Sequence, residues 1–550
     1  MQMENCSFNC GCQFTKLGTE TREDNGLPSI SLDIDHINYD CEETWNLICE
    51  GRTKGVFQLE SNLGKSWSKR IRPRTIEQLA ALSALLRPGC LKAIVDGKSM
   101  TQHYADRKNG VEDVTYMHES LEPILRSTQG VLVYQEQSMQ IAQKIAGFDL
   151  KEADNLRKAI GKKKADLMSK VKDSFLLGAA SKGVVSKEIA EEIFSWIEKS
   201  NRYAFNKSHA VSYAICGYWS AYCKCHFPLD FYCSYLYHAD GKQDSQQEIK
   251  ELVLDAKLSN IFVYPPSLKI INDKFSINNK KIHFGLKDIK SIGQSQVDKL
   301  VSNVKDQEEA LNKNISDFSW YEFLVSVSHK ITSTLTTSLI STGSLDHGGV
   351  SRNRMLYEFD TWKKLTKKEQ EWILSGIEKW KSLRDSMRDL QPLSKEGGGT
   401  FNVSRREIVG DLLKQLDNPP YPLEDTPDWI SKTEEDYLGV SITYSKVDSC
   451  DTSRANCTCK EIFDGREGKV IIAVSISRCE EYTITRGKSK GMKMGFLTVE
   501  DSTCELDSVV IFSDEWLKYK DLLVEGNTVL ISGEKTGNRE GIVIKSVSQI

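Results

Sequence analysis

Apolar residues recur at helical spacing through much of the region between residues 52 and 237. In residues 76–86, leucine and alanine return every three or four positions until Pro88 and Gly89 stop the pattern. The same spacing predicts five further helices, which cover residues 135–146, 151–160, 165–181, 187–199 and 211–225. This region is therefore expected to be mainly helical.

The pattern changes after residue 260. Short β-like segments at residues 276–278 and 281–285 precede a helix expected at residues 296–304. A polar, tryptophan-bearing helical tract is expected at residues 362–388, and the proline-rich residues 418–422 mark a linker.

The last 85 residues or so favour an all-β domain. Five β-branched or apolar runs are expected to be strands, at residues 469–476, 494–501, 506–512, 528–533 and 541–547. A short helix is expected at residues 514–523, between the third and fourth strands. This order suits a small barrel of the OB type, which often binds oligonucleotides. A β-barrel without a ligand is the alternative.

Composition places the chain among ordinary soluble proteins. Its 550 residues are long enough for three or four domains, with 39% hydrophobic and 27% charged residues. No apolar run reaches the roughly 18 residues of a membrane span. Residues 1–6 lack the features of a secretory signal, so the 15 cysteines are expected to be reduced thiols in the cytoplasm.

Charge is unevenly distributed along the chain. The net charge is −4, yet residues 51–230 hold 28 Lys and Arg against 19 Asp and Glu. A globally basic nucleic-acid binder is therefore excluded, whereas a basic segment within an acidic chain is compatible with binding to DNA. Scattered surface charge is the alternative.

The densest group of cations lies in residues 153–164. Arg157 and Lys158 are expected on the final turn of a helix. A glycine follows the helix, and three lysines follow the glycine. Clustered cations with a guanidinium among them suit a triphosphate or a nucleic-acid backbone. Stabilisation of a helix C-terminus explains one or two of the charges but not five. The five cations are Arg157, Lys158, Lys162, Lys163 and Lys164.

Two other polar segments give weaker signals. Asn206, Lys207 and His209 carry side chains that can contact phosphates where a helix begins, although an ordinary helix cap is the alternative. Residues 134–137 (YQEQ) lie at the start of another predicted helix, where capping is the more common role.

Five motifs in order carry a specific resemblance. They are residues 55–61 (GVFQLES), 85–89 (LLRPG), 134–137 (YQEQ), 156–163 (LRKAIGKK) and 205–209 (FNKSH). Together they closely resemble the fingers region of the C family of bacterial replicative DNA polymerases, the DNA polymerase III alpha subunits. The resemblance is dense over residues 30–345 and thinner over residues 465–550. The divergence between the motifs is as typical of a phage relative as of a cellular one.

The resemblance implies an architecture and an activity. The fold expected is a mainly α fingers region with helix-hairpin-helix units, followed by the OB-type barrel. The activity implied is that of a DNA-directed DNA polymerase, which adds deoxynucleoside triphosphates to the 3′ end of a primer on template DNA. Arg157 and Lys158 would contact the phosphates of the incoming nucleotide, with Lys54, Lys162 and Lys163 in the same pocket. The family often has arginine at both helix positions. With lysine at position 158, one of the two guanidinium groups that could bind phosphate in a bidentate way is missing.

Such a polymerase needs palm carboxylates that hold Mg²⁺. In the family these carboxylates lie upstream of the region matched here, so the palm is expected on another polypeptide or to be missing. Asp33 and Asp35 form one acidic pair, but they fall in a variable stretch and are not expected to be catalytic. The isolated chain is then expected to be inactive without a palm-bearing partner. The alternatives are a non-catalytic DNA-binding adaptor of the replisome and one half of a split polymerase.

Two further segments are candidate DNA contacts. Residues 288–295 resemble a helix-hairpin-helix turn in which Gly293 approaches a DNA phosphate, although Ser295 replaces the second glycine. A capping turn is the alternative. Lys488, Lys490 and Lys493 form a basic hairpin tip in the barrel that suits single-stranded template, and a solvated loop is the alternative.

Metal and clamp signals are weak. Cys6, Cys10 and Cys12 offer three thiols for zinc, but their spacing is not a standard one and a fourth ligand is not evident. A second group, residues 450–459, has the same weakness. Residues 415–417 (QLD) are a fragment of a sliding-clamp peptide, so a clamp partner stays open.

These signals divide the chain into five expected segments. They are residues 1–50 (a lead-in with the cysteine group), 51–260 (fingers), 261–365 (little finger and tandem helix-hairpin-helix), 366–464 (helical and linker) and 465–550 (OB-type domain).

Overall fold

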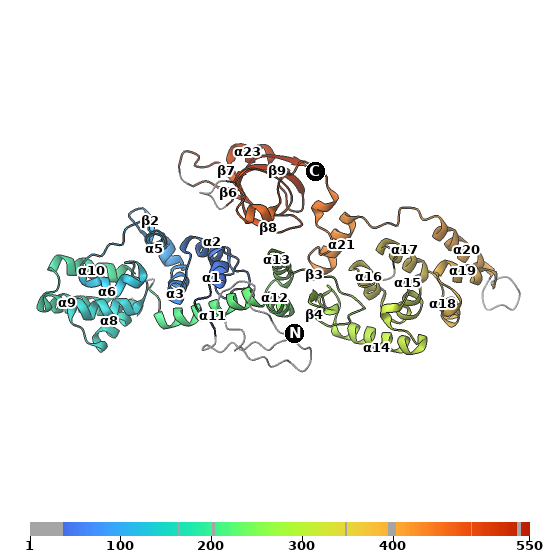
Figure 1. Ribbon diagram of the computed structural model, residues 1–550, viewed down its shortest axis with the longest axis horizontal. Helices are drawn as coiled ribbons and strands as arrows, with labels where there is room; N and C mark the ends of the chain where they lie inside the picture. The colour runs from blue at the N-terminus through green and yellow to red at the C-terminus, as the bar shows by residue number, and fades with distance from the viewer. Residues whose placement is uncertain are drawn as a thin grey trace. The chain divides into compact units, whose positions relative to one another are not determined.

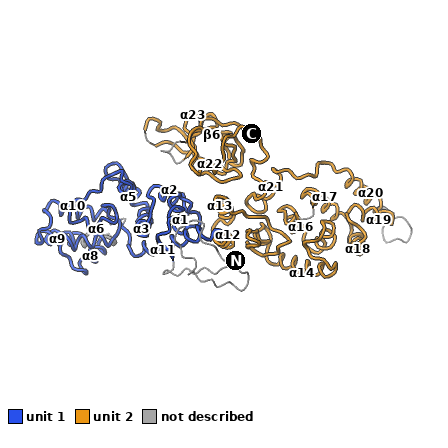
Figure 2. The backbone as a smooth tube through the Cα atoms, viewed as in Figure 1, with its two compact units in different colours: residues 1–228 blue, residues 229–550 orange. Residues whose placement is uncertain are grey.

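The computed structural model describes residues 37–162, 165–200, 204–346, 349–393, 403–485, 487–535 and 541–550. The chain divides into two compact units, residues 1–228 and residues 229–550, shown in different colours in Figure 2. Each unit is described by itself. No helix in the described ranges is long and apolar enough to cross a membrane.

Unit 1 is almost entirely helical (Figure 1). Its longer helices are α1 (Glu42–Cys49), α2 (Asn62–Ile71), α3 (Ile76–Leu85), α4 (Pro88–Lys92), α5 (Met100–Lys108), α6 (Glu122–Leu125), α7 (Gln135–Ala146), α8 (Leu150–Lys162), α9 (Ala165–Lys182), α10 (Lys187–Ser200) and α11 (Lys207–His226). Two short strands, β1 (Ile94–Val95) and β2 (Lys98–Ser99), form a hairpin, and two 3-10 turns, Glu119–Leu121 and Arg126–Thr128, flank α6.

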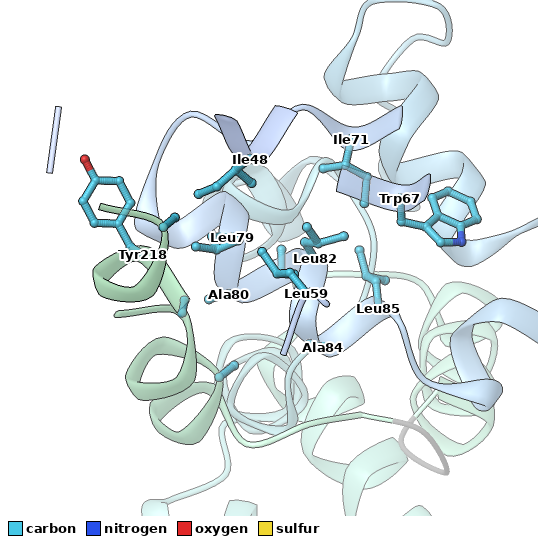
Figure 3. Packing of buried hydrophobic residues seen from close by; sticks show 14 of the residues in the cluster. Ile48, Leu59, Trp67, Ile71, Leu79, Ala80, Leu82, Ala84, Leu85 and Tyr218 are labelled. Atoms are coloured by element: carbon cyan, nitrogen blue, oxygen red, sulfur yellow. The ribbon is translucent and has the colours of Figure 1, made fainter. Parts of the chain in front are cut away.

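Unit 1 contains two separate hydrophobic cores. The first packs α1, α2 and α3 against α11, with Ile48, Leu82 and Tyr218 among its buried side chains (Figure 3). The second is formed by the bundle of helices α6–α10, and Ile141 and Phe175 lie at its centre. The bundle therefore has its own core within the unit.

Helix α8 illustrates how the sequence builds the bundle. Ala153, Leu156 and Ala159 recur at a spacing of three residues and are all buried against the other helices. The face between them carries Asp154, Arg157 and other polar residues. One stripe of the helix thus fixes it to the bundle and leaves the cations toward solvent.

Unit 2 begins with a mixed region of helices and short strands. Its helices are α12 (Pro228–Tyr237), α13 (Ser245–Leu258), α14 (Gln294–Leu311), α15 (Trp320–Glu322), α16 (Ser333–Ser341), α17 (Arg352–Lys363), α18 (Lys367–Ser375), α19 (Leu383–Leu393), α20 (Val403–Asp417) and α21 (Pro427–Leu438). A three-stranded sheet in the order β3-β5-β4 comprises β3 (Val263–Tyr264), β4 (Ser276–Asn278) and β5 (Lys281–His283).

A buried ion pair fixes two of these helices to each other. Arg352 on α17 donates to Glu434 on α21 at 3.0 Å and to Asp346 at 2.7 Å. Glu434 also accepts hydrogen bonds from the backbone N–H groups of Ile442 and Thr443. Removing Arg352 would leave the buried carboxylate of Glu434 without its ion-pair partner, and breaking such a buried pair typically costs roughly 3–5 kcal/mol. The pair therefore specifies how this region packs.

The C-terminal strands close into a barrel in the order β10-β8-β7-β6-β9. The strands are β6 (Gly468–Thr483), β7 (Lys493–Glu500), β8 (Glu505–Ile511), β9 (Thr528–Lys535) and β10 (Ile542–Gln549), with α22 (Cys459–Phe463) before them and α23 (Ser513–Tyr519) after β8. Neighbouring strands are antiparallel except β8 and β10, which are parallel. Gly495 on β7 lies beneath the ring of Trp516, where a Cβ atom would come within 2.5 Å of the ring.

The expected order, helices first and then five strands, is confirmed, but several boundaries were wrong. Helix α8 continues through Gly161 to Lys162 instead of stopping at residue 160, so Arg157 and Lys158 do not lie on its final turn. Helix α11 begins four residues earlier than expected. The tract at residues 362–388 is helical as expected and comprises the end of α17, the whole of α18 and the beginning of α19.

Candidate functional site

Two distant segments of unit 1 meet as short extended strands. The backbone N–H of Phe205 donates to the carbonyl of Val133 at 3.0 Å, and the N–H of Gln135 donates to the carbonyl of Phe205 at 2.9 Å. Tyr134 and Phe205 thereby form an isolated parallel bridge. Helices α7 and α11 begin directly after these strands. We call this pairing the neck, because helices α7–α10 of the bundle lie between its two segments in the chain.

The start of α11 is capped from two sides. Asn206 accepts from the backbone N–H of His209 at 2.9 Å and from the Ser208 hydroxyl at 2.7 Å. Glu136 on α7 accepts from the Asn206 amide at 3.0 Å and from the backbone N–H of Lys207 at 2.9 Å. Asn206 is therefore a helix cap, the alternative that its sequence position left open.

The ammonium group of Lys207 lies near acidic and aromatic neighbours. It is 4.0 Å from a carboxylate oxygen of Glu77 and 5.9 Å from the centre of the Tyr134 ring. Gln137 stabilises the first segment of the neck, since its Oε1 atom accepts hydrogen bonds from the backbone N–H groups of Val133 and Tyr134, each at 3.0 Å. The expected capping role of residues 134–137 is confirmed for this residue.

A row of stacked side chains runs from the neck along α11. The Arg87 guanidinium lies 3.6 Å from the centre of the Phe205 ring, whose centre is 5.2 Å from that of His209. His209 is 3.9 Å from Tyr213, and Tyr213 is 5.0 Å from Phe57. His209 and Phe57 are exposed. The row joins three of the five sequence motifs into one surface.

Sequence reasoning missed Tyr213 and the roles of Phe57 and Arg87 in this row. His209 and Tyr213 are four residues apart, which places them on one side of α11, and Phe205 lies four residues before His209 in the segment that leads into the helix. That spacing was the available signal. The contacts with Phe57 and Arg87 join segments distant in the chain, which local spacing does not reveal.

Arg157 and Lys158 share one carboxylate on α8. Asp154 accepts from Arg157 Nε at 2.9 Å and from Arg157 Nη2 at 2.7 Å, while Lys158 Nζ lies 2.7 Å from its other oxygen. Hydrogen bonds from Lys158 and Arg157 lower the pKa of Asp154 below its ordinary value. The side chains of Arg157 and Lys158 are 39% and 51% exposed. Both cations are therefore positioned by Asp154 and accessible to a ligand.

The other members of the predicted nucleotide pocket are placed differently. Lys163 and the side chain of Lys162 lie outside the described residues, as does Lys164, which was predicted to contact DNA. Lys54 is only 4% exposed, and its carbonyl accepts from the ammonium group of the buried Lys224 at 2.9 Å. The structure thus places the Lys54 side chain in the interior and Arg157 at the surface.

The predicted hairpin turn of unit 2 precedes α14. Ser291 has a φ of 68°, and the N–H of Gly293 donates to the Gln296 side chain at 3.0 Å. A Cβ atom built on Gly293 would meet no described atom within 4 Å, so the backbone is open to a close approach. Lys290 is tied to α21, since its N–H donates to the Tyr437 carbonyl at 2.8 Å.

The three lysines of the barrel hairpin fall into two groups. Lys493 pairs with Glu481 on the adjacent strand at 2.5 Å. Lys488 and Lys490 are exposed in the loop between β6 and β7, and neither forms an ion pair with a described residue. Two of the three charges are therefore unneutralised within the described ranges.

The described side chains do not form a metal site. Across the described ranges, no three His, Cys, Asp or Glu residues gather in a way that could hold a metal ion. Cys457 and Cys459 are buried in the barrel core, and within the described ranges they do not gather with other ligands into a group that could hold zinc. The described residues likewise offer no fitting carboxylate set for Mg²⁺. Asp33, Asp35 and the predicted zinc ligands Cys6, Cys10 and Cys12 lie outside them.

Comparisons with known proteins agree with the five motifs. Residues 15–183 match the model of the bacterial DNA polymerase III alpha subunit finger domain, and residues 260–355 match a helix-hairpin-helix motif. The DNA polymerase III subunit alpha of Aquifex aeolicus is 34% identical over 421 residues, 76% of this chain and 34% of that protein. The Bacillus subtilis protein of the same name is 30% identical over 509 residues, 92% of this chain and 41% of that protein.

A third relative extends the match. The DNA polymerase III subunit alpha of Staphylococcus aureus is 28% identical over 519 residues, which is 94% of this chain and 43% of that protein. The chain thus spans between about a third and two fifths of the length of the curated relatives it matches.

Proposed function

Because this chain belongs to the family of the bacterial DNA polymerase III alpha subunit, we propose that it supplies the fingers and the DNA-binding surfaces of a replicative DNA polymerase. In this proposal the assembled enzyme adds deoxynucleotides to the 3′ end of a primer in the cytoplasm of a bacterial or phage-infected cell. The observation that carries it is the convergence of motif segments around residues 57, 87, 134–137 and 205–213 on one surface of unit 1.

The proposal assigns the incoming triphosphate to Arg157 and Lys158. A guanidinium group has five N–H donors, and Asp154 takes two of those of Arg157, so three are left for phosphate oxygens. Lys158 donates to the same carboxylate and has further donors as well. Asp154 would thus hold both side chains in place before the nucleotide arrives, which reduces the entropy lost on binding.

DNA is assigned to separate surfaces in the two units. Lys207 and His209 on unit 1 and the open turn at Gly293 on unit 2 are the proposed duplex contacts. Lys488 and Lys490 are the proposed contacts to single-stranded template. The proposed domain division is the five segments expected from the sequence. A sliding clamp is a further candidate partner.

We assign the C-terminal barrel to the OB type. Numbered along the chain, its strands lie in the order 1-2-3-5-4 and close back on strand 1, strands 3 and 5 are parallel, and α23 lies between strands 3 and 4. This topology supports the assignment, since OB folds are five-stranded Greek-key barrels that bind oligonucleotides.

We assign the carboxylates that bind Mg²⁺ to a palm-bearing polypeptide, because the parts matched here are the finger domain and the helix-hairpin-helix motif. When bound, Mg²⁺ would activate the primer 3′ oxygen and stabilise the leaving oxygen. The residues of this chain would bind the triphosphate, orient it and hold the template.

Reconstitution tests the proposal. The purified chain should extend no labelled primer alone, and it should support extension when mixed with a palm-bearing polypeptide of the same source. Extension by the chain alone, abolished by Asp33→Asn, would instead place the metal site at Asp33. DNA binding without any incorporation in the mixture would favour a non-catalytic replisome adaptor.

A further inference from the structure

Five exposed lysines lie on and around helix α18 of unit 2, which follows α17 and precedes α19 in the chain (Figure 1). One lies at the end of α17, two open α18, and two flank Trp380 in the connection to α19. None of the five forms an ion pair with a described residue. We call them the lysine patch, and they are Lys364, Lys367, Lys368, Lys379 and Lys381.

The segment that carries the lysine patch is positive within an acidic part of the chain. Residues 363–393 hold eight Lys and Arg against five Asp and Glu, whereas all residues outside 51–230 together hold 45 against 58. One of the five carboxylates, Glu369, is only 1% exposed and is paired with Arg405. Glu371 and Glu378 are exposed, but neither forms an ion pair with a described residue. Positive charge is therefore in excess at this surface.

The backbone that carries the first three lysines is firmly anchored. Glu369 accepts from the backbone N–H of Thr366 at 2.6 Å, and the Thr366 hydroxyl accepts from the backbone N–H of Glu369 at 3.3 Å. Arg405 on α20 donates to Glu369 at 2.8 Å and to the carbonyl of Lys364 at 3.1 Å. These bonds fix the start of α18 without using any of the ammonium groups.

A pair of tryptophans connects the two ends of the lysine patch. The ring centres of Trp372 on α18 and Trp380 lie 5.0 Å apart at an angle of 40°, and the indole N–H of Trp380 donates to Asp389 at 2.7 Å. The Trp380 ring also lies over Gly376, where a Cβ atom would come within 2.9 Å of it. Lys368 precedes Trp372 by four residues and so lies on the same side of α18. The segment after α18 is thus folded back onto the helix.

Stabilisation of the helix does not explain the lysines at the start of α18. Lys367 and Lys368 are its first two residues, where the helix dipole disfavours positive charge. Lys367 and Glu371 are spaced for an intrahelical ion pair, but the structure contains none between them. The two cations therefore oppose the dipole and are left for a ligand.

We propose that the lysine patch binds the phosphate backbone of duplex DNA. This inference rests on the proposed DNA-binding function and adds a contact surface outside residues 15–183 and 260–355, the segments matched to the finger domain and the helix-hairpin-helix motif. Lysines are point charges that suit phosphates of any sequence, and duplex DNA presents one negative charge per roughly 1.7 Å of its axis. Trp372 and Trp380 are half-buried against each other, so base stacking is not the expected mode.

Lysine footprinting of the full chain tests the location of the contact. The unmodified protein is acetylated with a succinimidyl ester, with and without blunt duplex DNA, and each lysine is quantified by mass spectrometry. Duplex should protect Lys367, Lys368 and Lys379 from acetylation. Three exposed lysines elsewhere in unit 2 form no ion pair with a described residue and should react equally in both samples, namely Lys432, Lys518 and Lys520.

Affinity measurements test the contribution of the same residues. The combined Lys367→Ala, Lys368→Ala and Lys379→Ala variant should flatten the slope of log affinity against log salt by about 2.7, which is about 0.9 for each phosphate. At about 0.1 M salt it should bind duplex roughly 10- to 500-fold more weakly. The three matching lysine-to-arginine changes keep the charges and should preserve binding. Alanine at residues 432, 518 and 520 removes the same number of charges and should leave the slope unaltered.

Three outcomes overturn the lysine patch. One is acetylation of its lysines at the same rate with and without duplex, which would favour an acidic protein as the ligand of this surface. Another is an unchanged slope in the patch variant, and the third is an equal loss in the variant altered at residues 432, 518 and 520. Each of these leaves the proposed DNA-binding function intact. Failure of the unmodified chain to bind duplex would instead overturn that function.

Discussion

The Oε2 atom of Glu136 accepts a hydrogen bond of 2.9 Å from the backbone N–H of Lys207. A carboxylate from the first turn of α7 thereby satisfies one of the unpaired N–H groups at the start of α11, 71 residues later in the chain. The negative charge also complements the helix dipole at that end. Two of the five sequence motifs, residues 134–137 and 205–209, are thus held together by one side chain.

Replacing Glu136 should destabilise the neck. Glu136→Ala removes charge-assisted bonds to Lys207 and Asn206, and we expect a loss of roughly 1.5–3 kcal/mol in the free energy of unfolding of unit 1. Glu136→Gln keeps an acceptor and should lose less. Urea denaturation followed by circular dichroism measures both.

Glu191→Ala on α10 provides the control, because Glu191 is exposed and forms no ion pair with a described residue. Its effect should stay within about 0.5 kcal/mol. Equal losses for the Glu136 and Glu191 variants would contradict a capping role.

Arg157→Ala should impair nucleotide use in the reconstituted enzyme. The loss of charge-assisted bonds worth roughly 1.5–3 kcal/mol predicts about a 10- to 100-fold lower kcat/KM for the nucleotide. Affinity for primer-template should change by less than about twofold, because one cation among many alters that interaction little. Steady-state nucleotide titration and DNA binding are the measurements.

The alternative is that Arg157 only stabilises α8 through Asp154. A helical ion pair of this spacing contributes about 0.2–0.5 kcal/mol, so the alternative predicts a small stability change and unaltered nucleotide kinetics. Asp154→Asn distinguishes the two, since it removes the ion pair but keeps both cations. A normal kcat/KM in Arg157→Ala would reject the nucleotide assignment.

Stability of unit 1 should fall as the pH drops below about 6.5. His226, 3.1 Å from the thiol of Cys41, has its pKa lowered to about 4 by burial, against an opposing effect of Glu43. The unfolded chain then binds a proton at this histidine that the folded chain does not bind until about pH 4. Lowering the pH from 7 to 5.5 should therefore cost on the order of 1 kcal/mol at this site.

Urea midpoints of the unmodified chain and His226→Gln at pH 7 and 5.5 isolate this contribution. Carboxylates titrate in both proteins, so the difference between the two pH dependences belongs to His226. The variant should lose less stability on acidification than the unmodified chain. Parallel pH dependences would show that His226 is protonated equally in the folded and unfolded states.

Primer-template binding should weaken steeply with added salt. If the basic residues of the two units neutralise several phosphates, log affinity should fall linearly with log salt at about −0.9 per neutralised phosphate of duplex. Titrations between about 50 and 200 mM salt measure the slope. A flat dependence would mean that phosphate contacts do not drive binding.

Local sequence signals located α7 to the residue but not α8 or α11. Helix α7 has capping at Tyr134 and a stop at Gly147, both within the segment itself. Helix α8 passes through Gly161, where the cost of about 1 kcal/mol for glycine does not end the helix. The early start of α11 depends on Asn206 together with Glu136, which is distant in the sequence.

In the barrel, too, local sequence signals failed to locate the end of an element. Strand β6 was expected to end at residue 476, where its apolar pattern fades, but it continues to Thr483. The extra residues are polar and mostly exposed, and they are strand because they pair with β7. Pairing between strands is a non-local property that a window of sequence does not contain. Of the candidate site, the sequence identified the cations but not the carboxylates that hold them.

The neck makes helices α7–α10 of the bundle a topological insertion. Helices α7–α10 lie between Val133 and Phe205 in the chain, and these two residues are hydrogen-bonded neighbours. The neck therefore holds the two ends of the α7–α10 segment together beside the first core, whatever length of chain lies between them. Insertions and deletions among the bundle loops should be absorbed inside the bundle, which gives this segment freedom to diverge while α3 and α11 keep their packing.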